Sequence, residues 1–156
     1  MTKTVTRALI LAGAVLVLAG VNVAIFQKER VIRTGDTVYL ELAPVDPRSL
    51  MQGDYMALRF RLADDVERWR EVDPRTRRAP LAIDDRGVAT LAPGSGEIDI
   101  AFRMRGGRVW LGTNAYFFEE GTAGRYTGAR FGEFRVDPAT GEAVLVGLRD
   151  ADLNPL

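Results

Sequence analysis

The chain has 156 residues, which is enough for one compact domain and an anchor but not for two full cores. It contains no cysteine and no histidine, so disulfides, thiolate chemistry and imidazole catalysis are excluded. The formal net charge is zero, but residues 1–30 carry four basic and one acidic side chain, against 17 basic and 20 acidic in residues 31–156. A mildly acidic domain does not attract a phosphate backbone, so we predict no nucleic-acid binding.

Residues 8–26 (ALILAGAVLVLAGVNVAIF) form a run without a charged side chain. At about 1.5 Å per residue a helix over this run spans roughly 28 Å, close to the hydrocarbon thickness of a bilayer. Basic residues flank both ends, with Arg7 before the run and Lys28 after it. We predict that residues 1–30 anchor the chain in a membrane as a single pass. The short leading tail favours a cytoplasmic N-terminus and an extracytoplasmic, periplasmic domain.

A cleaved signal peptide and a buried core helix are the alternatives to an anchor. The apolar run is long for a signal peptide, and its best pair of small residues, Val17 and Ala19, lies inside the run. A core helix that is apolar on all sides would need more cover than the roughly 130 remaining residues supply. The uncleaved anchor is therefore the favoured interpretation.

Beyond residue 30 the helical periodicity gives way to the alternation typical of half-buried strands. Residues 37–42 place Val38, Leu40 and Leu42 on one face, and residues 54–62 repeat the pattern. Further strands are expected at residues 87–91, 97–104, 108–111, 116–118, 129–136 and 142–148. A short helix is expected over residues 64–71 with Asp64 as its cap, followed by a solvated connection over residues 71–80. Residues 31–156 are thus predicted to be a mainly β domain, a small antiparallel barrel or sandwich with a short helical insertion.

Residues 44–60 (PVDPRSLMQGDYMALRF) are the densest unusual segment. Its prolines and the Gly53-Asp54 pair indicate a stiff connection that turns directly into a strand. On this interpretation Asp46 and Asp54 bond nearby amides, and Arg48 pairs with one of the two carboxylates.

Five residues of this segment resemble the motif of the GDYXXLXY family of bacterial membrane-anchored proteins: Gly53, Asp54, Tyr55, Leu58 and Phe60. Phe60 stands where the motif has tyrosine, which removes one hydroxyl. The preceding Asp46-Pro47-Arg48 also resembles the family, as do residues 117–136 and 141–150. The family carries no established activity, so the resemblance implies a membrane-anchored architecture and no reaction. Members of the family are often encoded beside multi-span membrane proteins, so the resemblance also implies a membrane partner.

Serine catalysis lacks a base in this chain. The same segment resembles the region after the nucleophile of type I signal peptidases, in which Ser49 would attack and a lysine would accept its proton. Beyond Lys28 the chain contains no lysine. We therefore predict no catalytic residue.

Adjacent carboxylates do not indicate a catalytic site, which leaves carboxylate chemistry open only through residues distant in sequence, such as Asp46 with Glu119. Three adjacent acidic pairs occur at residues 64–65, 84–85 and 119–120. Neighbours on a strand point to opposite faces, so these pairs are expected to form turns or to be solvated. Without histidine, cysteine, an EF-hand loop or a phosphate-binding loop, we predict no metal and no cofactor.

The other dense segment is aromatic and consists of Tyr116, Phe117, Phe118 and Glu119, followed by Tyr126. A strand buried on both faces is the expected structure, because three consecutive aromatic residues cannot all face one core. If exposed, the segment is the best candidate for a surface that contacts a partner.

The leading prediction is a non-catalytic domain that contacts another inner-membrane or envelope protein. Two alternatives remain open. An envelope hydrolase would bring Asp46, Arg48, Asp54 and Glu119 together around a cleft, and a ligand-binding β-barrel would enclose an apolar cavity. No small-molecule ligand is indicated by the residues themselves.

Overall fold

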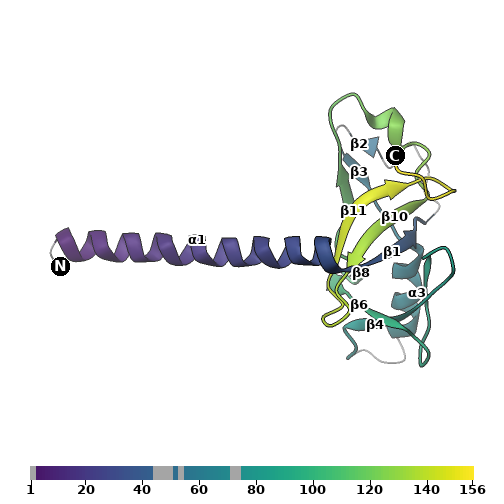
Figure 1. The fold of residues 1–156 in the computed structure, drawn as a ribbon, viewed down its shortest axis with the longest axis horizontal. Coiled ribbons are helices and arrows are strands. Elements are labelled where there is room, and N and C mark those ends of the chain that lie inside the picture. Colours follow the sequence, from purple (N-terminus) through teal and green to yellow (C-terminus); the bar gives the residue numbers. More distant parts are fainter. Residues whose placement is uncertain (1–2, 44–50, 53–54, 71–74) are drawn as a thin grey trace.

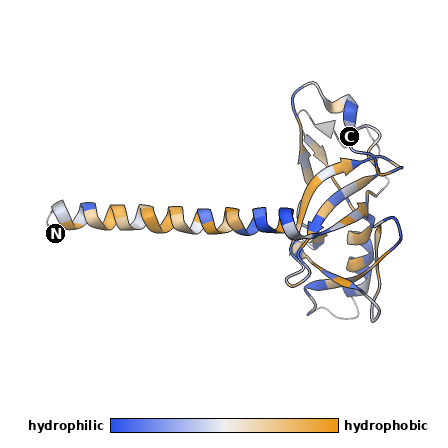
Figure 2. Ribbon diagram, in the orientation of Figure 1, coloured by the Kyte–Doolittle hydropathy of each residue, from blue (hydrophilic) through white to orange (hydrophobic). Residues whose placement is uncertain are grey.

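One long helix, α1 (Lys3–Thr34), projects from a β-rich domain that lies across its end (Figure 1). The computed structural model describes residues 3–43, 51–52, 55–70 and 75–156. The apolar residues of α1 before Val31 are exposed around the helix, and no residue of its most apolar 18-residue stretch is buried. Figure 2 shows this apolar surface along the helix and hydrophilic residues where α1 joins the domain. The helix is long and apolar enough to cross a membrane, and a buried core helix is excluded.

The last turns of α1 are fixed to the domain. The helix continues to Thr34, past the predicted boundary at residue 30, and Val31 is buried against the domain. Gly35 ends the helix, and its amide donates a hydrogen bond to the Val31 carbonyl at 2.8 Å. A Cβ at Gly35 would lie 2.6 Å from that carbonyl oxygen and 3.0 Å from the Val136 carbonyl oxygen. The close approach therefore requires glycine at this junction.

The domain is built mainly from short antiparallel sheets. The first has the order β1-β10-β11, from β1 (Asp36–Glu41), β10 (Phe131–Val136) and β11 (Ala143–Arg149). The second has the order β2-β3-β9, from β2 (Met51–Gln52), β3 (Tyr55–Ala57) and β9 (Ala115–Phe117). The third has the order β5-β4-β6, from β5 (Ala89–Leu91), β4 (Arg78–Ile83) and β6 (Ile98–Ala101). A separate hairpin pairs β7 (Arg103–Arg105) with β8 (Arg108–Trp110).

Two short helices complete the domain: α3 (Arg61–Arg70) and the 3-10 turn η1 (Ala123–Tyr126). The predicted mainly β domain with a short helical insertion is thus confirmed. The strands that the structure describes form separate sheets and do not close into a ring. The choice between a barrel and a sandwich stays a prediction.

Residues on the inward faces of the strands form one core. Val38 and Leu40 are fully buried, as the alternation in β1 predicts, and β10 faces them with Phe134. The ring of Phe60 packs edge-on against Phe134 with centroids 5.2 Å apart. A Cβ at Gly132 would lie 2.8 Å from the Phe60 ring, so the smallest residue is needed where these rings meet.

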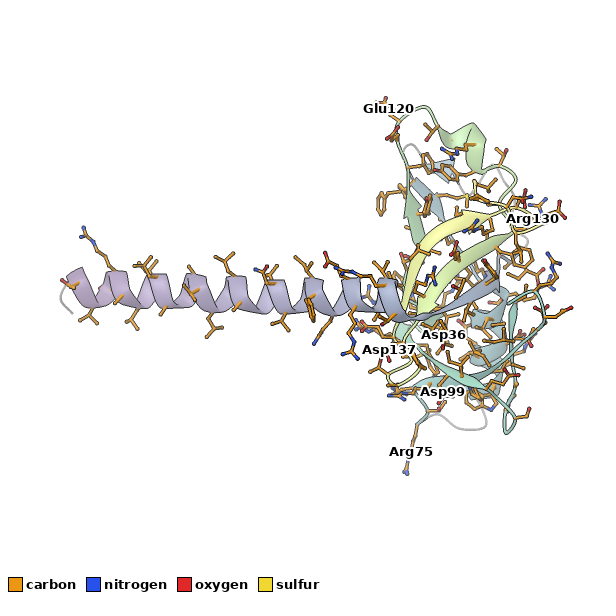
Figure 3. All side chains as sticks on the ribbon, in the orientation of Figure 1. Asp36, Arg75, Asp99, Glu120, Arg130 and Asp137 are labelled. Carbon is orange, nitrogen blue, oxygen red and sulfur yellow. The ribbon has the colours of Figure 1, made fainter. Side chains whose placement is uncertain are left out.

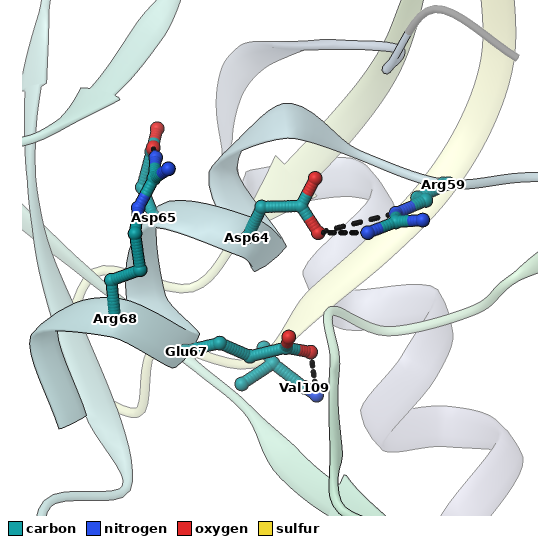
Figure 4. Close-up of polar contacts among 6 residues, drawn as sticks. All are labelled: Arg59, Asp64, Asp65, Glu67, Arg68 and Val109. Atoms are coloured by element: carbon teal, nitrogen blue, oxygen red, sulfur yellow. Dashed lines mark hydrogen bonds and ion pairs between the residues drawn. The ribbon is translucent and has the colours of Figure 1, made fainter. Parts of the chain in front are cut away.

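The predicted strand over residues 54–62 is wrong beyond Ala57. β3 ends there, and α3 begins at Arg61. Leu62 is buried as expected, but in the first turn of α3 rather than in a strand. The early start also moves Asp64 from the predicted cap into the first turn, where its carboxylate pairs with Arg59 at 2.8 Å (Figure 4). Alternation of apolar residues could not distinguish a strand from a helix here, because Leu62 faces the core in both.

Part of the predicted solvated connection, residues 71–80, is also wrong. β4 begins at Arg78, and Ala79 is fully buried opposite Ile100 of β6. The sequence gives no sign of this strand, because Ala79 is a small apolar residue between an arginine and a proline. Its burial comes from its neighbours in the sheet rather than from its own composition.

Candidate functional site

The aromatic residues identified in the sequence lie in the edge strand β9, directly after it, and in η1. Tyr116, Phe117, Phe118, Glu119 and Tyr126 are called the aromatic patch. Phe117 is 75% exposed. Tyr116 and Phe118 point the other way, and each packs on the ring of Tyr126 with centroids 5.2 Å apart. The expected burial on both faces is therefore wrong for Phe117, because the alternation along the strand turns its ring to solvent.

Tyr55 supports the exposed ring from the neighbouring strand. It lies directly opposite Phe117 in the antiparallel pairing of β3 with β9. The two rings are 5.7 Å apart and inclined at 40°, and cross-strand aromatic pairs of this kind stabilise a sheet. The described tyrosine of the GDY motif therefore helps to position the most exposed aromatic residue of the domain.

A shallow hollow of about 450 Å³ lies beside Phe117. Its lining consists of Phe117, Phe118, Glu119, Thr122, Arg125 and Tyr126. The Thr122 hydroxyl and amide both donate to the Glu119 carbonyl, at 2.6 and 3.1 Å, and hold the turn that leads into η1. Burial raises the pKa of the Tyr116 hydroxyl, and its hydrogen bond with Tyr126 raises this pKa further. The hollow thus combines neutral aromatic rings with charged residues at its rim, a composition common in protein interfaces.

The remaining motif residues divide into two groups. Leu58 and Phe60 are buried in the core, where they have almost no surface for a partner. Asp46, Pro47, Arg48, Gly53 and Asp54 lie outside the described residues. Convergence of Asp46, Arg48, Asp54 and Glu119 on one cleft therefore stays a prediction, and the structure places only Glu119, which is exposed at the patch.

The adjacent acidic pairs have local partners. Asp64 pairs with Arg59, whereas Asp65 points to Arg68 in the next turn of α3 (Figure 4). Asp84 accepts hydrogen bonds from two amides of its own turn at 2.9 and 2.8 Å. Within the described ranges, no group of three or more acidic residues is gathered so that it could hold a metal ion. Asp64, Asp65 and Asp84 thus act as the turn formers and surface charges that the sequence predicts.

Sequence reasoning missed a buried ion pair between β10 and β11. Glu133 is only 7% exposed. Its carboxylate accepts hydrogen bonds from Nε of Arg149, at 2.7 Å, and from a terminal nitrogen of the same guanidinium. No motif joins these two residues, and only the pairing of the strands brings them together.

A second missed feature is a cavity of about 420 Å³ beside α1. Its charged lining residues are Lys28, Arg77, Arg78, Arg103, Arg105 and Glu142, and this cavity is called the arginine pocket. A sequence signal for it did exist. In residues 103–110 (RMRGGRVW) the alternation places arginines on one face of a hairpin.

The fold and the patch define a class of protein: one membrane-spanning candidate helix followed by a small antiparallel β domain with an aromatic edge strand. Comparison with family models identifies the family. The model of the GDYXXLXY protein family matches residues 17–148, from within α1 to β11. The chain belongs to the GDYXXLXY protein family. Comparison with curated proteins and with solved structures found no match.

Proposed function

We propose that this chain is a single-pass protein of the bacterial inner membrane, with a cytoplasmic N-terminus and a periplasmic domain. The domain binds another membrane or envelope protein and catalyses no reaction. The exposure of Phe117 on the edge strand β9 is the observation that carries this proposal.

An aromatic side chain exposed to this extent is unusual in the domain. Outside α1, the only large hydrophobic side chains exposed among the described residues are Phe117, at 75%, and Val146, at 38%. Burying a phenylalanine side chain in an interface is favourable by roughly 1.5–3 kcal/mol. Aromatic residues also dominate the binding energy of many interfaces. Leaving Phe117 in water is therefore unfavourable unless a partner covers it.

The position of β9 provides a second means of recognition. In the sheet β2-β3-β9 the strand lies at the edge, and no further strand pairs with it among the described residues. An extended segment of a partner can add to such an edge through main-chain hydrogen bonds. The hollow between Phe117 and Tyr126 would then accept a side chain of that segment.

The patch is accessible from the plane of the membrane. Glu120, which follows the patch, lies at the end of the domain remote from Arg75 and on the side from which α1 leaves (Figure 3). A partner embedded in the same membrane can therefore reach it. The anchor confines both proteins to two dimensions, which raises their effective concentration and favours a weak interface.

The test is crosslinking in intact membranes followed by capture of the full chain. Phe117→Ser is expected to abolish a crosslinked partner seen with the native chain. The domain should stay folded and lose only about 0.2–1 kcal/mol, because the exposed ring contributes a cross-strand contact with Tyr55. Val146→Ser removes the other exposed apolar side chain and is the matched control, expected to keep the partner. Equal recovery of the partner with Phe117→Ser and the native chain would rule out the patch.

Orientation is tested separately, because the chain has no native cysteine. Glu120→Cys in intact cells is expected to react with a thiol reagent that does not cross the inner membrane. Thr2→Cys is expected to react only after the cells are opened. The opposite labelling pattern would contradict the proposed topology.

A further inference from the structure

The arginine pocket lies at the level of the membrane surface. Lys28 lines it and stands two residues beyond Phe26, the last residue of the apolar run. At about 1.5 Å per residue, this places Lys28 roughly 3 Å past the end of the run. The headgroup layer of a bilayer is about 5–7 Å deep on each side. When residues 8–26 span the hydrocarbon core, the pocket therefore faces phospholipid headgroups.

The hairpin of β7 and β8 supplies an unusual concentration of positive charge. Arg103 and Arg105 share one face of β7, and their partners on β8 are Trp110 and Arg108. Arg105 and Arg108 thus face each other directly across the hairpin, and like charges in this arrangement destabilise a strand pair. Residues 101–111 contain no acidic side chain. An anion held between these cations would relieve their repulsion.

The carboxylate that lines the pocket is already paired. Glu142, in the turn between β10 and β11, forms an ion pair with Lys28. Arg103 and Arg105 have no carboxylate partner among the described residues. The lining thus keeps a net positive charge although residues 31–156 are acidic as a whole.

The pocket is also shaped before anything binds. The guanidinium carbon of Arg105 lies over the Trp110 ring, 4.5 Å from its centroid, and this cation–π contact restricts the position of the guanidinium group. Arg78 donates a hydrogen bond to the Ala139 carbonyl at 3.2 Å and so ties β4 to the turn beside α1. Planar guanidinium groups bind phosphate oxygens through paired hydrogen bonds.

We propose that the arginine pocket binds the phosphate group of an anionic phospholipid from the membrane that holds α1. A lipid bound there is a second attachment point beside the helix and fixes the domain against the membrane surface. The inference rests on the single membrane pass of the proposed function, but not on the orientation of the chain or on the aromatic patch.

The test uses Trp110 as a reporter inside the pocket. The chain has two tryptophans, and Trp69→Phe leaves Trp110 as the only indole. The full chain is placed in nanodiscs of phosphatidylcholine that contain a small fraction of a lipid with brominated chains. This quenching lipid is either phosphatidylglycerol or phosphatidylcholine. Brominated phosphatidylglycerol is expected to quench Trp110 more strongly at equal fraction, and increasing salt is expected to reduce the difference.

Arg103→Gln with Arg105→Gln is expected to weaken this lipid preference strongly. Each basic side chain near an anionic surface changes binding by about fivefold, so the loss of both should weaken the preference by about 25-fold. The matched control is Arg86→Gln with Arg130→Gln, which removes the same charge outside the pocket and is expected to keep the preference. Arg130 lies on the side of the domain away from α1 (Figure 3).

Three results would overturn the assignment: equal quenching by the two lipids with the native arginines, the same loss in the control pair, or a preference that is not weakened in the pocket variant. One further arm of the experiment distinguishes a lipid from a free anion. Inorganic phosphate, added at constant ionic strength to discs without phosphatidylglycerol, is expected to leave the emission of Trp110 unchanged. A shift that saturates with inorganic phosphate would identify a soluble anion as the ligand instead. If the pocket variant does not fold, the salt and phosphate arms on the native arginines still decide the proposal.

Discussion

Replacement of Glu133 by alanine is expected to destabilise the domain strongly. Glu133 is 7% exposed. Its carboxylate forms an ion pair with the Arg149 guanidinium, which is its nearest cation, and Arg135 lies 3.9 Å away. Removing one partner of a buried ion pair usually lowers the free energy of unfolding by about 3–5 kcal/mol. The Arg149 side chain is 21% exposed, so water partly solvates the charge that is left behind. We therefore expect a loss of about 2–3 kcal/mol, at or below the lower limit of that range.

The assay is thermal unfolding of the full chain in detergent, followed by near-ultraviolet circular dichroism. Both tryptophans lie in the β domain, so this signal reports the domain rather than α1. For a domain of this size, each kcal/mol shifts the melting temperature by about 3–5 °C. Glu133→Ala is thus expected to melt about 10 °C lower than the native chain. Glu120→Ala, which removes an exposed carboxylate, is the control and is expected to change the free energy by less than about 0.5 kcal/mol.

A double-mutant cycle separates the ion pair from other effects of the substitution. Glu133→Ala leaves the Arg149 guanidinium unpaired, and adding Arg149→Ala removes that guanidinium. The double variant is therefore expected to lose less free energy of unfolding than the two single variants lose together. The expected coupling is about 1–2 kcal/mol. Additive single effects, or a Glu133→Ala variant as stable as the native chain, would refute this account of the pair.

Three further predictions concern the core, the helix junction and acid stability. Phe60→Ala removes the ring that packs on Phe134 and is expected to lower the free energy of unfolding by about 3–5 kcal/mol. Phe60→Leu is expected to lower it less. Similar denaturant midpoints for the two variants would contradict this packing. Gly35→Ala is expected to lower the melting temperature and speed proteolysis at the junction, because its Cβ would meet two backbone carbonyls. Gly124→Ala, where the space is open, is the control, and equal behaviour would count against the junction geometry. At Asp137 the amides of Thr140 and Ala139 lower the carboxyl pKa. Its stabilising effect is therefore present above the unfolded-state pKa of roughly 3.9 and is lost as pH falls through the folded-state pKa. Asp137→Asn should make the melting temperature less sensitive to acid between about pH 5 and pH 3, and an unchanged acid profile would argue against these hydrogen bonds.

Local pattern was sufficient for the long apolar helix and for most strands. The apolar run of α1 is a property of consecutive residues, and so is the alternation that buries Val38 and Leu40 in β1. The hairpin of β10 and β11 followed from alternation on both sides of a turn-forming segment. The motif that includes Tyr55 was sufficient to indicate the family, which the match over residues 17–148 confirms.

Long-range contacts decided what local pattern could not. The change from strand to helix near Arg61, and the buried strand around Ala79, depend on neighbours that are distant in sequence. The same holds for Glu133, whose partner comes from the opposite strand.

The two candidate surfaces show most clearly which features the sequence determines and which depend on the tertiary structure. The sequence by itself determined that this chain has an apolar helix, a β-rich domain, an aromatic segment and no histidine, cysteine or domain lysine. Only the tertiary structure decided that Phe117 faces water while its neighbours pack inward, and that arginines from separate strands gather beside Lys28. The physical reason is that exposure and charge density depend on which segments pack together, and a side chain's neighbours in space are set by the pairing of strands.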